Sequence, residues 1–255
     1  MNIAASNAAE IALIKAELRT KFEIVELGPV RWLIGLAIRR DRATRTVGIF
    51  QMALINNIVS QFGLTDAHPV STPLDHNVHL SHDDCPRTES ERSAIVTIPY
   101  RQLIGSLMYL ILGSRPDIAF AVSHLSQFNV NPGLRHWTAA KHVVRYLKGS
   151  CNFELTLGDT CPTEIHGYCD ASFGGVPGPD GSGARRSISG FGFSFGRSCG
   201  LISWSSKRQD TTATSTSAAE YVASAHAAKE ALWLQNVLEL LEFDILRPSI
   251  IHCDN

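Results

Sequence analysis

The chain has 255 residues, of which 44% are hydrophobic and 18% charged, and this length suggests one large domain or two modest ones. Its 23 basic and 24 acidic residues nearly cancel, which excludes a basic tail protein and an acidic disordered one. The charges are unevenly distributed along the chain. Residues 1–160 carry 16 basic and 14 acidic side chains, whereas residues 161–255 carry 7 and 10.

Membrane and targeting signals are not visible in the sequence. No apolar run reaches about 18 residues, and the N-terminus lacks the charged-then-apolar layout of a signal peptide. The six cysteines form no C-x-x-C pair and no zinc spacing, so they predict reduced thiols rather than a disulfide framework. We therefore expect an intracellular protein with no membrane partner, in a compartment that no motif specifies.

The first 68 residues predict a helix, a hairpin and a second helix. In residues 8–22, apolar side chains recur at helical spacing, with Asn7 as the N-cap. Two apolar stretches, 30–38 and 46–50, flank an arginine-rich turn and predict a β-hairpin. Residues 56–62 continue as a short helix closed by a glycine.

Residues 69–97 have a different composition, which is rich in proline and histidine and poor in large apolar side chains. This composition predicts a linker in which Asp83 and Asp84 are solvated. The helical period returns in residues 100–113, 117–128 and 137–147, with breaks at two prolines. Residues 98–149 are therefore expected to form a compact helical unit.

After residue 150 the period changes to two. Strands are predicted at 154–157, 165–172, 188–195, 201–205 and 249–253, with a long Ala- and Leu-rich helix at 216–241. Within residues 161–255 this gives the order β-β-β-α-β, in which a helix separates an antiparallel meander from a returning strand. The order indicates an α/β or α+β layout.

Three acidic residues stand out by their context. Asp170 lies inside an apolar strand, Glu220 lies near the start of the long helix, and Asp254 closes the final strand. An acid among core residues is costly to bury unless it is paired or binds a metal, and oxygen ligands favour Mg²⁺ or Mn²⁺. Taken singly, each acid also fits a surface carboxylate. Because Cys169 and Cys253 alternate with the acids, we expect these thiols to pack in the core.

The sequence resembles the C-terminal part of copia-type LTR retrotransposon polyproteins, which comprises the tail of the reverse transcriptase followed by ribonuclease H. The most specific segments are Tyr-Arg-Gln-Leu-Ile-Gly-Ser-Leu-Met-Tyr-Leu at 100–110, Arg-Pro-Asp-Ile at 115–118 and the Ala-Ala-Lys-His segment at 139–149. Further matches lie at 22–24, 27–35, 69–74, 168–171, 186–190, 202–209, 219–223 and 253–255. The order and spacing of these segments carry the resemblance.

The resemblance implies a domain layout. Residues 1–68 would be a reverse-transcriptase palm/thumb remnant, 69–97 a linker, 98–160 a helical thumb- or connection-like unit, and 161–255 a truncated ribonuclease H-like domain. The expected fold class is an α+β N-terminal part (helix, β-hairpin, helical thumb-like unit) followed by an incomplete α/β ribonuclease H-like fold.

The resemblance also implies site residues. Asp170, Glu220 and Asp254 match catalytic carboxylates that hold two Mg²⁺ (or Mn²⁺) ions about 3.5–4 Å apart. The implied reaction is hydrolysis of RNA in an RNA–DNA hybrid, which is recognised by its A-form shape. No other cofactor is expected.

Two departures from the family pattern limit this expectation. The polymerase Tyr-x-Asp-Asp turn, expected upstream of Met1, is absent, and nothing follows Asn255, where the family has a further helix-strand-helix and a fourth acid. We therefore expect a polyprotein fragment whose cleavage is weak or absent, with the remainder of the polyprotein as a further partner. Whether such a chain is an enzyme is left open.

Basic side chains suggest contact with nucleic acid. Lys141, Arg145 and Lys148 fall on one face of a predicted helix, where they could follow the phosphate backbone of a template–primer. Lys207 and Arg208 follow a predicted strand and could touch a hybrid near the metals. The plain alternative is a solvated helix face. At the level of function, the alternatives are a non-catalytic nucleic-acid-binding or domesticated interaction protein, or a non-functional relic.

Overall fold

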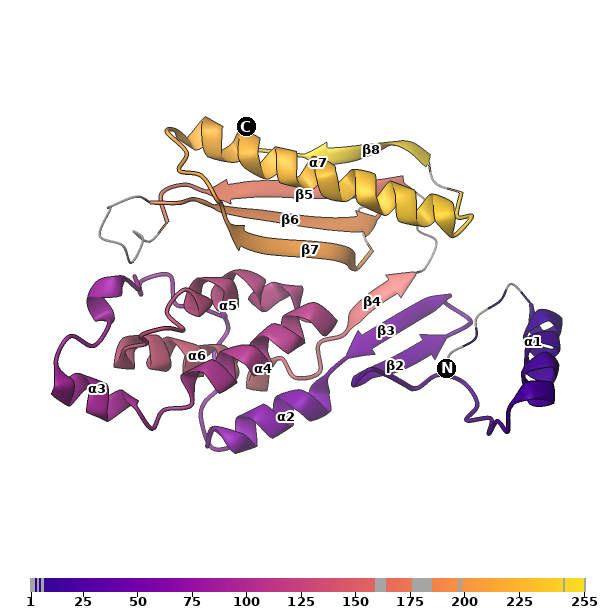
Figure 1. The fold of residues 1–255 in the computed structure, drawn as a ribbon, viewed down its shortest axis with the longest axis horizontal. Coiled ribbons are helices and arrows are strands. Elements are labelled where there is room, and N and C mark those ends of the chain that lie inside the picture. Colours follow the sequence, from indigo (N-terminus) through magenta and orange to yellow (C-terminus); the bar gives the residue numbers. More distant parts are fainter. Residues whose placement is uncertain are drawn as a thin grey trace.

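The structure is a computed structural model that describes residues 3, 5, 7–158, 164–175, 185–196, 199–244 and 246–254. Within these residues the chain forms two four-stranded sheets and a cluster of helices (Figure 1). The N-terminal sheet and the helices occupy one half of the molecule. The C-terminal sheet and one long helix occupy the other half. Cys161 and Asn255 lie outside the described residues.

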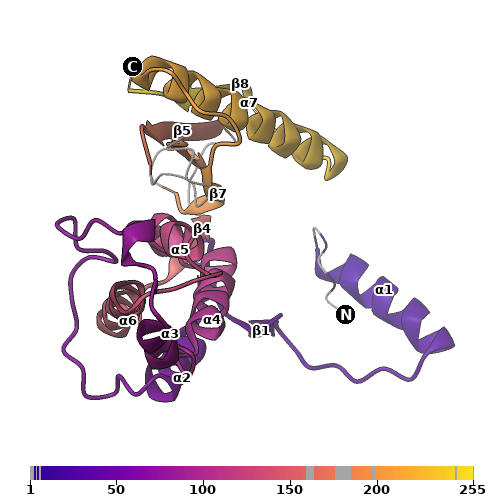
Figure 2. The same cartoon turned by 60° about the vertical axis from the view of Figure 1, so that its left-hand side comes forward.

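The first helix, α1 (Ala8–Lys21), stands apart from the rest of the described chain (Figure 2). Asn7 caps it as predicted, because its Oδ1 accepts a hydrogen bond from the Glu10 amide at 2.9 Å. None of its residues is buried, and Leu13 is 71% exposed. The predicted helix is confirmed, but its apolar side chains have no packing partner among the described residues.

The N-terminal sheet contains the predicted hairpin. Its strands are β1 (Trp32–Leu33), β2 (Leu36–Asp41), β3 (Thr46–Phe50) and β4 (Leu155–Gly158), all antiparallel in that order. Asp41 closes the turn between β2 and β3 by accepting from the Ala43 and Thr44 amides. Strand β4 comes from more than 100 residues further along the chain, so it ties the end of the helical unit back to the hairpin.

Helices from both sides of residues 69–97 share one core. They are α2 (Met52–Gln61), α4 (Tyr100–Gly113), α5 (Ala119–Ser126) and α6 (Leu134–Gly149), with the 3₁₀ turn η2 (Pro116–Ile118). Residues 69–97 themselves contain the 3₁₀ turn η1 (His82–Asp84) and the short helix α3 (Glu89–Ile95), neither of which has a buried residue. The largest hydrophobic cluster joins Ile55 and Ile58 of α2 to Leu107 of α4 and Val143 of α6. Burial of this shared apolar surface is the main force that holds these helices together.

Residues 69–97 are more ordered than their composition predicts. Leu80 is 4% exposed and belongs to the helical core. Ser81 and Thr88 begin η1 and α3 with reciprocal capping boxes, in which Asp84 and Glu91 are the partners. The prediction of a solvated Asp84 was wrong, because its side chain is 9% exposed and pairs with Arg135 at 2.5 Å.

The C-terminal sheet has the predicted order of elements. Strands β5 (Glu164–Ser172), β6 (Ile188–Phe195) and β7 (Leu201–Arg208) form an antiparallel meander, helix α7 (Thr216–Leu240) follows, and β8 (Leu246–His252) returns parallel to β5. The sheet order is β7-β6-β5-β8. Helix α7 lies on one face of this sheet through a row of small side chains, Ala219, Ala223, Ala227 and Ala231 (Figure 1). Their size lets the helix approach the strands closely.

The other face of the C-terminal sheet looks toward the helical unit (Figure 1). Trp204 of β7 reaches across, and its indole Nε1 donates to the main-chain oxygen of Ile111 in α4 at 3.1 Å. Helix α5 also contacts β7. The two halves are therefore joined by side chains on the face that α7 leaves uncovered.

No single described helix is long and apolar enough to cross a membrane. Helices α3 and α4 together, bent by 50°, reach that length and composition.

Candidate metal centre

The three predicted acids meet at one end of the C-terminal sheet. Asp170 is near the end of β5, Asp254 follows the end of the neighbouring strand β8, and Glu220 is in the second turn of α7. One oxygen from each carboxylate lies within 4.8 Å of the others. Asp170 and Asp254 are exposed and Glu220 is half-buried, so the cluster is open to solvent. The sequence prediction that these acids converge is met by the geometry.

Glu220 has an unsatisfied oxygen in this cluster. Its Oε1 accepts from the amide of Ala171 at 3.2 Å, whereas its Oε2 is buried and has no hydrogen-bond partner among the residues that the structure describes. Burial raises the pKa of Glu220, and the negative charges of Asp170 and Asp254 raise it further, although the Ala171 amide acts in the opposite direction. A bound cation would relieve both the unsatisfied oxygen and the repulsion.

The ligand atoms fit a hard divalent cation. All three are carboxylate oxygens, which suit Mg²⁺ or Mn²⁺ better than soft thiophilic metals. On an octahedral Mg²⁺, cis oxygens stand about 3.0 Å apart and trans oxygens about 4.2 Å, so three oxygens within 4.8 Å of one another could close around one ion by side-chain movement. The donor set and the orphaned Glu220 Oε2 together support the predicted site.

The first turn of α7 is held in place by residues that sequence reasoning missed. The Ser215 side chain caps the helix by accepting from the Ala218 amide at 3.1 Å. Gln209 is 1% exposed, and its Nε2 donates to Ser189 Oγ and to the Ala219 carbonyl, both at 2.9 Å. Gln209 therefore links β6 to Ala219, the residue directly before Glu220. Its only sequence signal was its place at the end of the segment 202–209.

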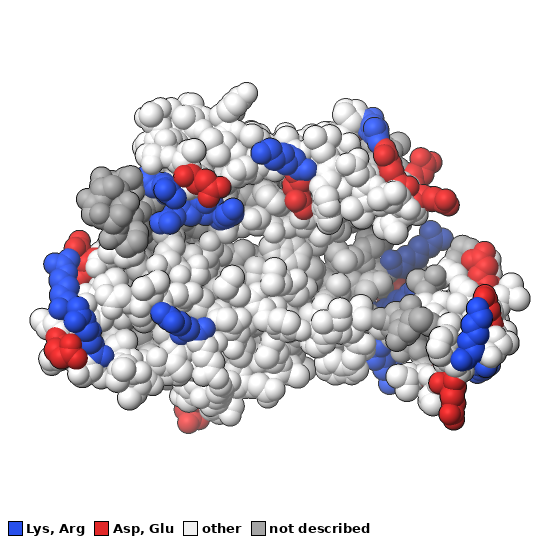
Figure 3. Space-filling view, in the orientation of Figure 1, with Lys and Arg blue, Asp and Glu red and all other residues white. Residues whose placement is uncertain are grey.

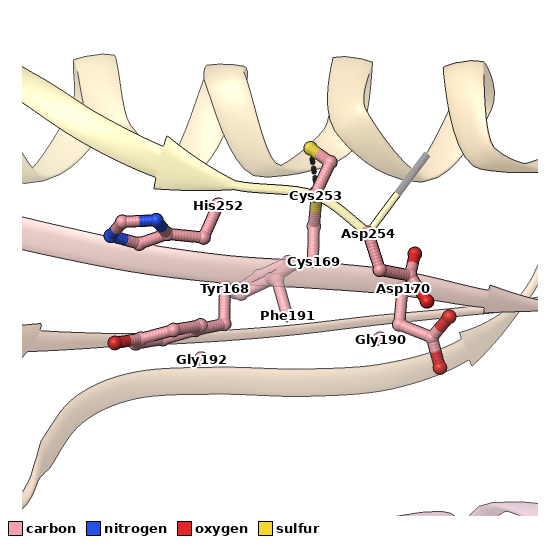
Figure 4. A pocket seen from close by; sticks show the side chains of 9 residues that line it. All are labelled: Tyr168, Cys169, Asp170, Gly190, Phe191, Gly192, His252, Cys253 and Asp254. Carbon is pink, nitrogen blue, oxygen red and sulfur yellow. Dashed lines mark hydrogen bonds between the residues drawn. The ribbon is translucent and has the colours of Figure 1, made fainter.

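The cysteines beside the acids face away from them. Cys169 is 6% exposed, and its Sγ lies 2.8 Å from Cys253 Sγ and 3.6 Å from Ser224 Oγ of α7. Figure 4 shows both sulfurs on the α7 side of the strands, away from the carboxylates. Burial raises the pKa of Cys169 to about 11, so its thiol is neutral at pH 7. The prediction of core packing is confirmed for Cys169, but it was wrong for Cys253, which is exposed because it lies beyond the end of β8.

The prediction of reduced thiols holds for only some of the described cysteines. Cys85, Cys151, Cys169 and Cys253 are free, but Cys199 is disulfide-bonded. The prediction was therefore wrong for Cys199. The spacing of cysteines in a sequence reveals local metal and redox motifs, but it does not reveal which other thiols are oxidised.

The predicted basic stripe on α6 makes internal contacts. Arg145 Nε donates to the main-chain oxygen of His68 at 2.7 Å, and Lys148 Nζ donates to that of Ala67 at 2.9 Å. Lys141 lies over the ring of Trp137, with 5.7 Å to its centroid. Arg145 and Lys148 hold residues 65–68 against the helix. Their contact with nucleic acid stays a prediction.

The second predicted basic pair lies nearer the acids. Lys207 is exposed near the end of β7, and it is two strands across from Ala171 through Ser189. Two strand spacings amount to about 9.6 Å. Arg208 is half-buried beside it. On the face shown in Figure 3, basic and acidic side chains are interspersed around a large uncharged centre.

Comparison with known proteins identifies relatives over nearly the whole chain. It is 38% identical over 245 residues to the retrovirus-related Pol polyprotein from transposon TNT 1-94 of Nicotiana tabacum, covering 96% of this chain and 18% of that polyprotein. It is 30% identical over 238 residues to the Pol polyprotein from transposon RE1 of Arabidopsis thaliana, covering 93% of this chain and 15% of that polyprotein. An uncharacterised mitochondrial protein of Arabidopsis thaliana is 32% identical over 219 residues, covering 85% of this chain and 83% of that protein.

No family model matches the chain, and no solved structure matches it significantly. The fold and the three acids define a mixed α/β protein with a carboxylate site suited to divalent cations. Over most of its own length the chain is similar to retrovirus-related Pol polyproteins of transposons. It spans less than a fifth of the length of the two polyproteins compared above. The predicted relation to retrotransposon polyproteins is confirmed at this level.

Proposed function

We propose that the carboxylate cluster hydrolyses the phosphodiester backbone of RNA paired with DNA, as the ribonuclease H part of a copia-type retrotransposon polyprotein. The observation that carries this proposal is the convergence of Asp170, Glu220 and Asp254 from two strands and a helix, with ligand oxygens within 4.8 Å. The order β5-β6-β7-α7-β8 of the supporting elements agrees with the expectation for that class of domain.

The roles of the three acids follow from their positions. Glu220 offers its unpartnered Oε2 from the half-buried side, while Asp170 and Asp254 offer oxygens from the exposed side. Bound Mg²⁺ would activate a water molecule and stabilise the charge that develops on the phosphate. Gly190, opposite Asp170 on β6, adds no side chain above the sheet, so a bulky backbone can approach the acids.

In this proposal residues 7–158 derive from the tail of the reverse transcriptase. The shared core of α2, α4, α5 and α6 supports its treatment as one unit. A contact between Lys207 and the phosphate backbone of the hybrid is part of the proposal, although the register of Lys207 with Ala171 puts its side chain on the opposite face of the sheet from Asp170. The remainder of the polyprotein is a further proposed partner.

A cleavage assay tests the proposal. The purified full chain would be incubated with an RNA–DNA hybrid labelled on the RNA, in Mg²⁺, in Mn²⁺ and in EDTA. We expect metal-dependent cleavage that Asp170→Asn lowers by more than about 100-fold, because even outer-shell changes at metal sites cost about 10–100-fold. Asp66→Asn, an exposed acid in the other half of the molecule, is the matched control and should leave the rate unchanged.

Two results would contradict the proposal. One is the absence of cleavage in both metals, and the other is cleavage that persists in Asp170→Asn. Salt-sensitive binding of the hybrid without cleavage would instead favour the non-catalytic nucleic-acid-binding alternative.

A further inference from the structure

A trough crosses the face of the C-terminal sheet that α7 leaves uncovered. The register places His252, Tyr168, Gly192 and Trp204 side by side on the four strands. Two residues further along β5, Asp170 lies beside Gly190 of β6, which in turn lies beside Ser206 of β7. Both positions on β6 are glycine, so the middle of each row has a bare floor between side chains of β5 and β7.

One wall of the trough is an ordered stack of rings. Tyr168 stacks on His252 with centroids 4.8 Å apart and 22° between the planes, and His252 in turn stacks on His166 at 5.7 Å and 11°. His166 is buried and its Nε2 lies 2.9 Å from Glu164 Oε2, which anchors the far end of the stack. Tyr168 is 46% exposed and lies beside Gly192 (Figure 4). The tyrosine ring is therefore held in place before any ligand arrives.

The opposite wall and the roof come from β7 and the helical unit. Trp204 is fixed by its hydrogen bond to Ile111, and Phe120 of α5, which is 47% exposed, borders the same cavity of about 590 Å³. This volume is in the range of cavities that take small planar ligands. The cavity extends from Phe120 and Trp204 to Asp170, so it is continuous with the candidate metal centre.

The lining indicates the chemistry of the occupant. None of the described residues that line the trough is Lys or Arg, so the trough is not built for a phosphate group. Its aromatic faces and glycine floor suit a flat ring, and stacking on an aromatic side chain is worth about 1–3 kcal/mol per base. Asp170 lies two residues from Tyr168, about 6.7 Å along the strand, which is within the span of one nucleotide.

We propose that the trough binds an unpaired nucleobase next to the phosphodiester at the carboxylates, with the base stacked on Tyr168. The position of the phosphodiester in this inference rests on the proposed function, whereas the stacking of the base on Tyr168 does not. A paired base has its faces covered by its neighbours, so the occupant must be unstacked. The preferred substrate is then a hybrid with an unpaired nucleotide at a junction, rather than a continuous duplex.

A fluorescence experiment tests the stacking without relying on catalysis. The probe is an RNA–DNA hybrid with a single unpaired 2-aminopurine at its junction, titrated with the full chain in EDTA and in Mg²⁺. Stacking on Tyr168 should quench the probe. Tyr168→Leu should weaken binding about tenfold and abolish the quenching, whereas Tyr168→Phe should keep both.

Two further variants distinguish a loss of base stacking from a loss of the fold. Gly190 has no heavy atom closer than 3.8 Å to an added Cβ, so Gly190→Val fits the backbone while it fills the floor, and it should also abolish the quenching. Tyr221→Leu is the matched control, because Tyr221 is 80% exposed on α7 and does not line the trough. It should leave quenching and affinity unchanged.

The outcomes separate this inference from the proposed function. Quenching that depends on Tyr168 supports the trough even when no RNA is cleaved. Cleavage of junction and continuous hybrids at equal rates, together with unchanged quenching in Tyr168→Leu and Gly190→Val, would overturn the trough while it leaves the hydrolytic function standing.

Discussion

The guanidinium group of Arg115 donates hydrogen bonds to both the main-chain oxygen and the hydroxyl oxygen of Ser150, at 3.0 and 2.6 Å. Arg115 is 1% exposed, it pairs with Asp117 at 2.7 Å, and its guanidinium lies 5.6 Å from the ring centroid of Tyr146. These contacts join the turn after α4 to the end of α6. The Arg-Pro-Asp segment at 115–118, which was prominent in the sequence, thus has a structural role in the helical unit.

Replacing Arg115 tests this role. We expect Arg115→Met to lower the free energy of unfolding by about 3–5 kcal/mol, because it leaves Asp117 and Ser150 without their buried partner. Urea denaturation measures the change. Arg92→Met is the control, because Arg92 has an exposed side chain paired only with Glu89, and its effect should stay within about 0.5 kcal/mol. Equal effects of the two variants would contradict the role of Arg115 in joining the turn after α4 to the end of α6.

His136 predicts a dependence of stability on pH. Its Nδ1 accepts from the Gly133 amide at 2.8 Å, so its Nε2 carries the proton and donates to the Ser81 carbonyl at 3.1 Å. Burial lowers the pKa of His136 to about 4, although the charge of Asp84 and the bond to Ser81 oppose the shift. In the folded protein the ring therefore stays neutral well below the usual pKa of about 6.5.

The sign follows from proton uptake. Between pH 6.5 and 4 the unfolded chain binds a proton at this position and the folded chain does not, so the free energy of unfolding falls as the pH drops through this window. The loss amounts to about 3 kcal/mol when complete. His136→Gln should reduce this slope in urea denaturation measured at several pH values, and the part due to His124, whose pKa is also lowered by burial, should remain. His76→Gln, at an exposed position, should keep the whole slope. An unchanged slope in His136→Gln would assign the effect to other groups.

Local patterns in the sequence predicted the elements well where one face of an element is buried. The alternation of Cys169 with Asp170 placed the thiol in the core and the acid at the open face, as the structure shows. The bounds 100–113 and 188–195 agree with α4 and β6. In each of these segments the periodicity reflects burial directly.

Contacts between distant segments could not be predicted in this way. Leu80 looked like a linker residue because its neighbours are polar, yet it fills the helical core. The Ser81 and Thr88 capping boxes were overlooked among prolines and histidines. Gln209 positions α7 through partners from two other elements, which no local spacing reveals.

The α6 stripe offers a way to separate stability from nucleic-acid binding. Arg145→Ala removes a donor to the His68 carbonyl and should lower the free energy of unfolding by about 1 kcal/mol. Lys141→Ala, which removes only a contact with Trp137, should change stability less. If the stripe also follows a phosphate backbone, each variant should reduce the salt slope of hybrid binding by about 1. Unchanged salt slopes in both variants would leave the stripe with a structural role only.

Gln209 is expected to act on the metal centre through α7. Gln209→Leu removes both hydrogen bonds that Gln209 donates, to Ser189 and to Ala219, so the start of α7 that leads into Glu220 is less well fixed. We expect Mg²⁺ affinity, measured by calorimetry, to fall about 10-fold or more, as for other groups that orient metal ligands. Gln235→Leu is the control, because Gln235 bonds to Ser249 at the far end of α7. The same loss of affinity in both variants would indicate general destabilisation instead.

The acidic cluster predicts opposite effects of one substitution with and without a cation. In EDTA, Asp254 adds negative charge beside Asp170 and Glu220, so Asp254→Asn should raise the melting temperature. In Mg²⁺ the unmodified chain should gain stability, by about 2.7 kcal/mol at a concentration of 100 times Kd. Asp254→Asn should lose most of that gain, because it removes one of three ligands.

Melting curves at matched ionic strength, with NaCl in place of MgCl₂, separate specific binding from screening. Asp66→Asn should behave as the unmodified chain under every condition, because this exposed acid lies in the other half of the molecule. Destabilisation by Asp254→Asn in EDTA would mean that the carboxylate serves the fold rather than a cation. A gain in Mg²⁺ that NaCl reproduces would show that the three acids do not form a specific site.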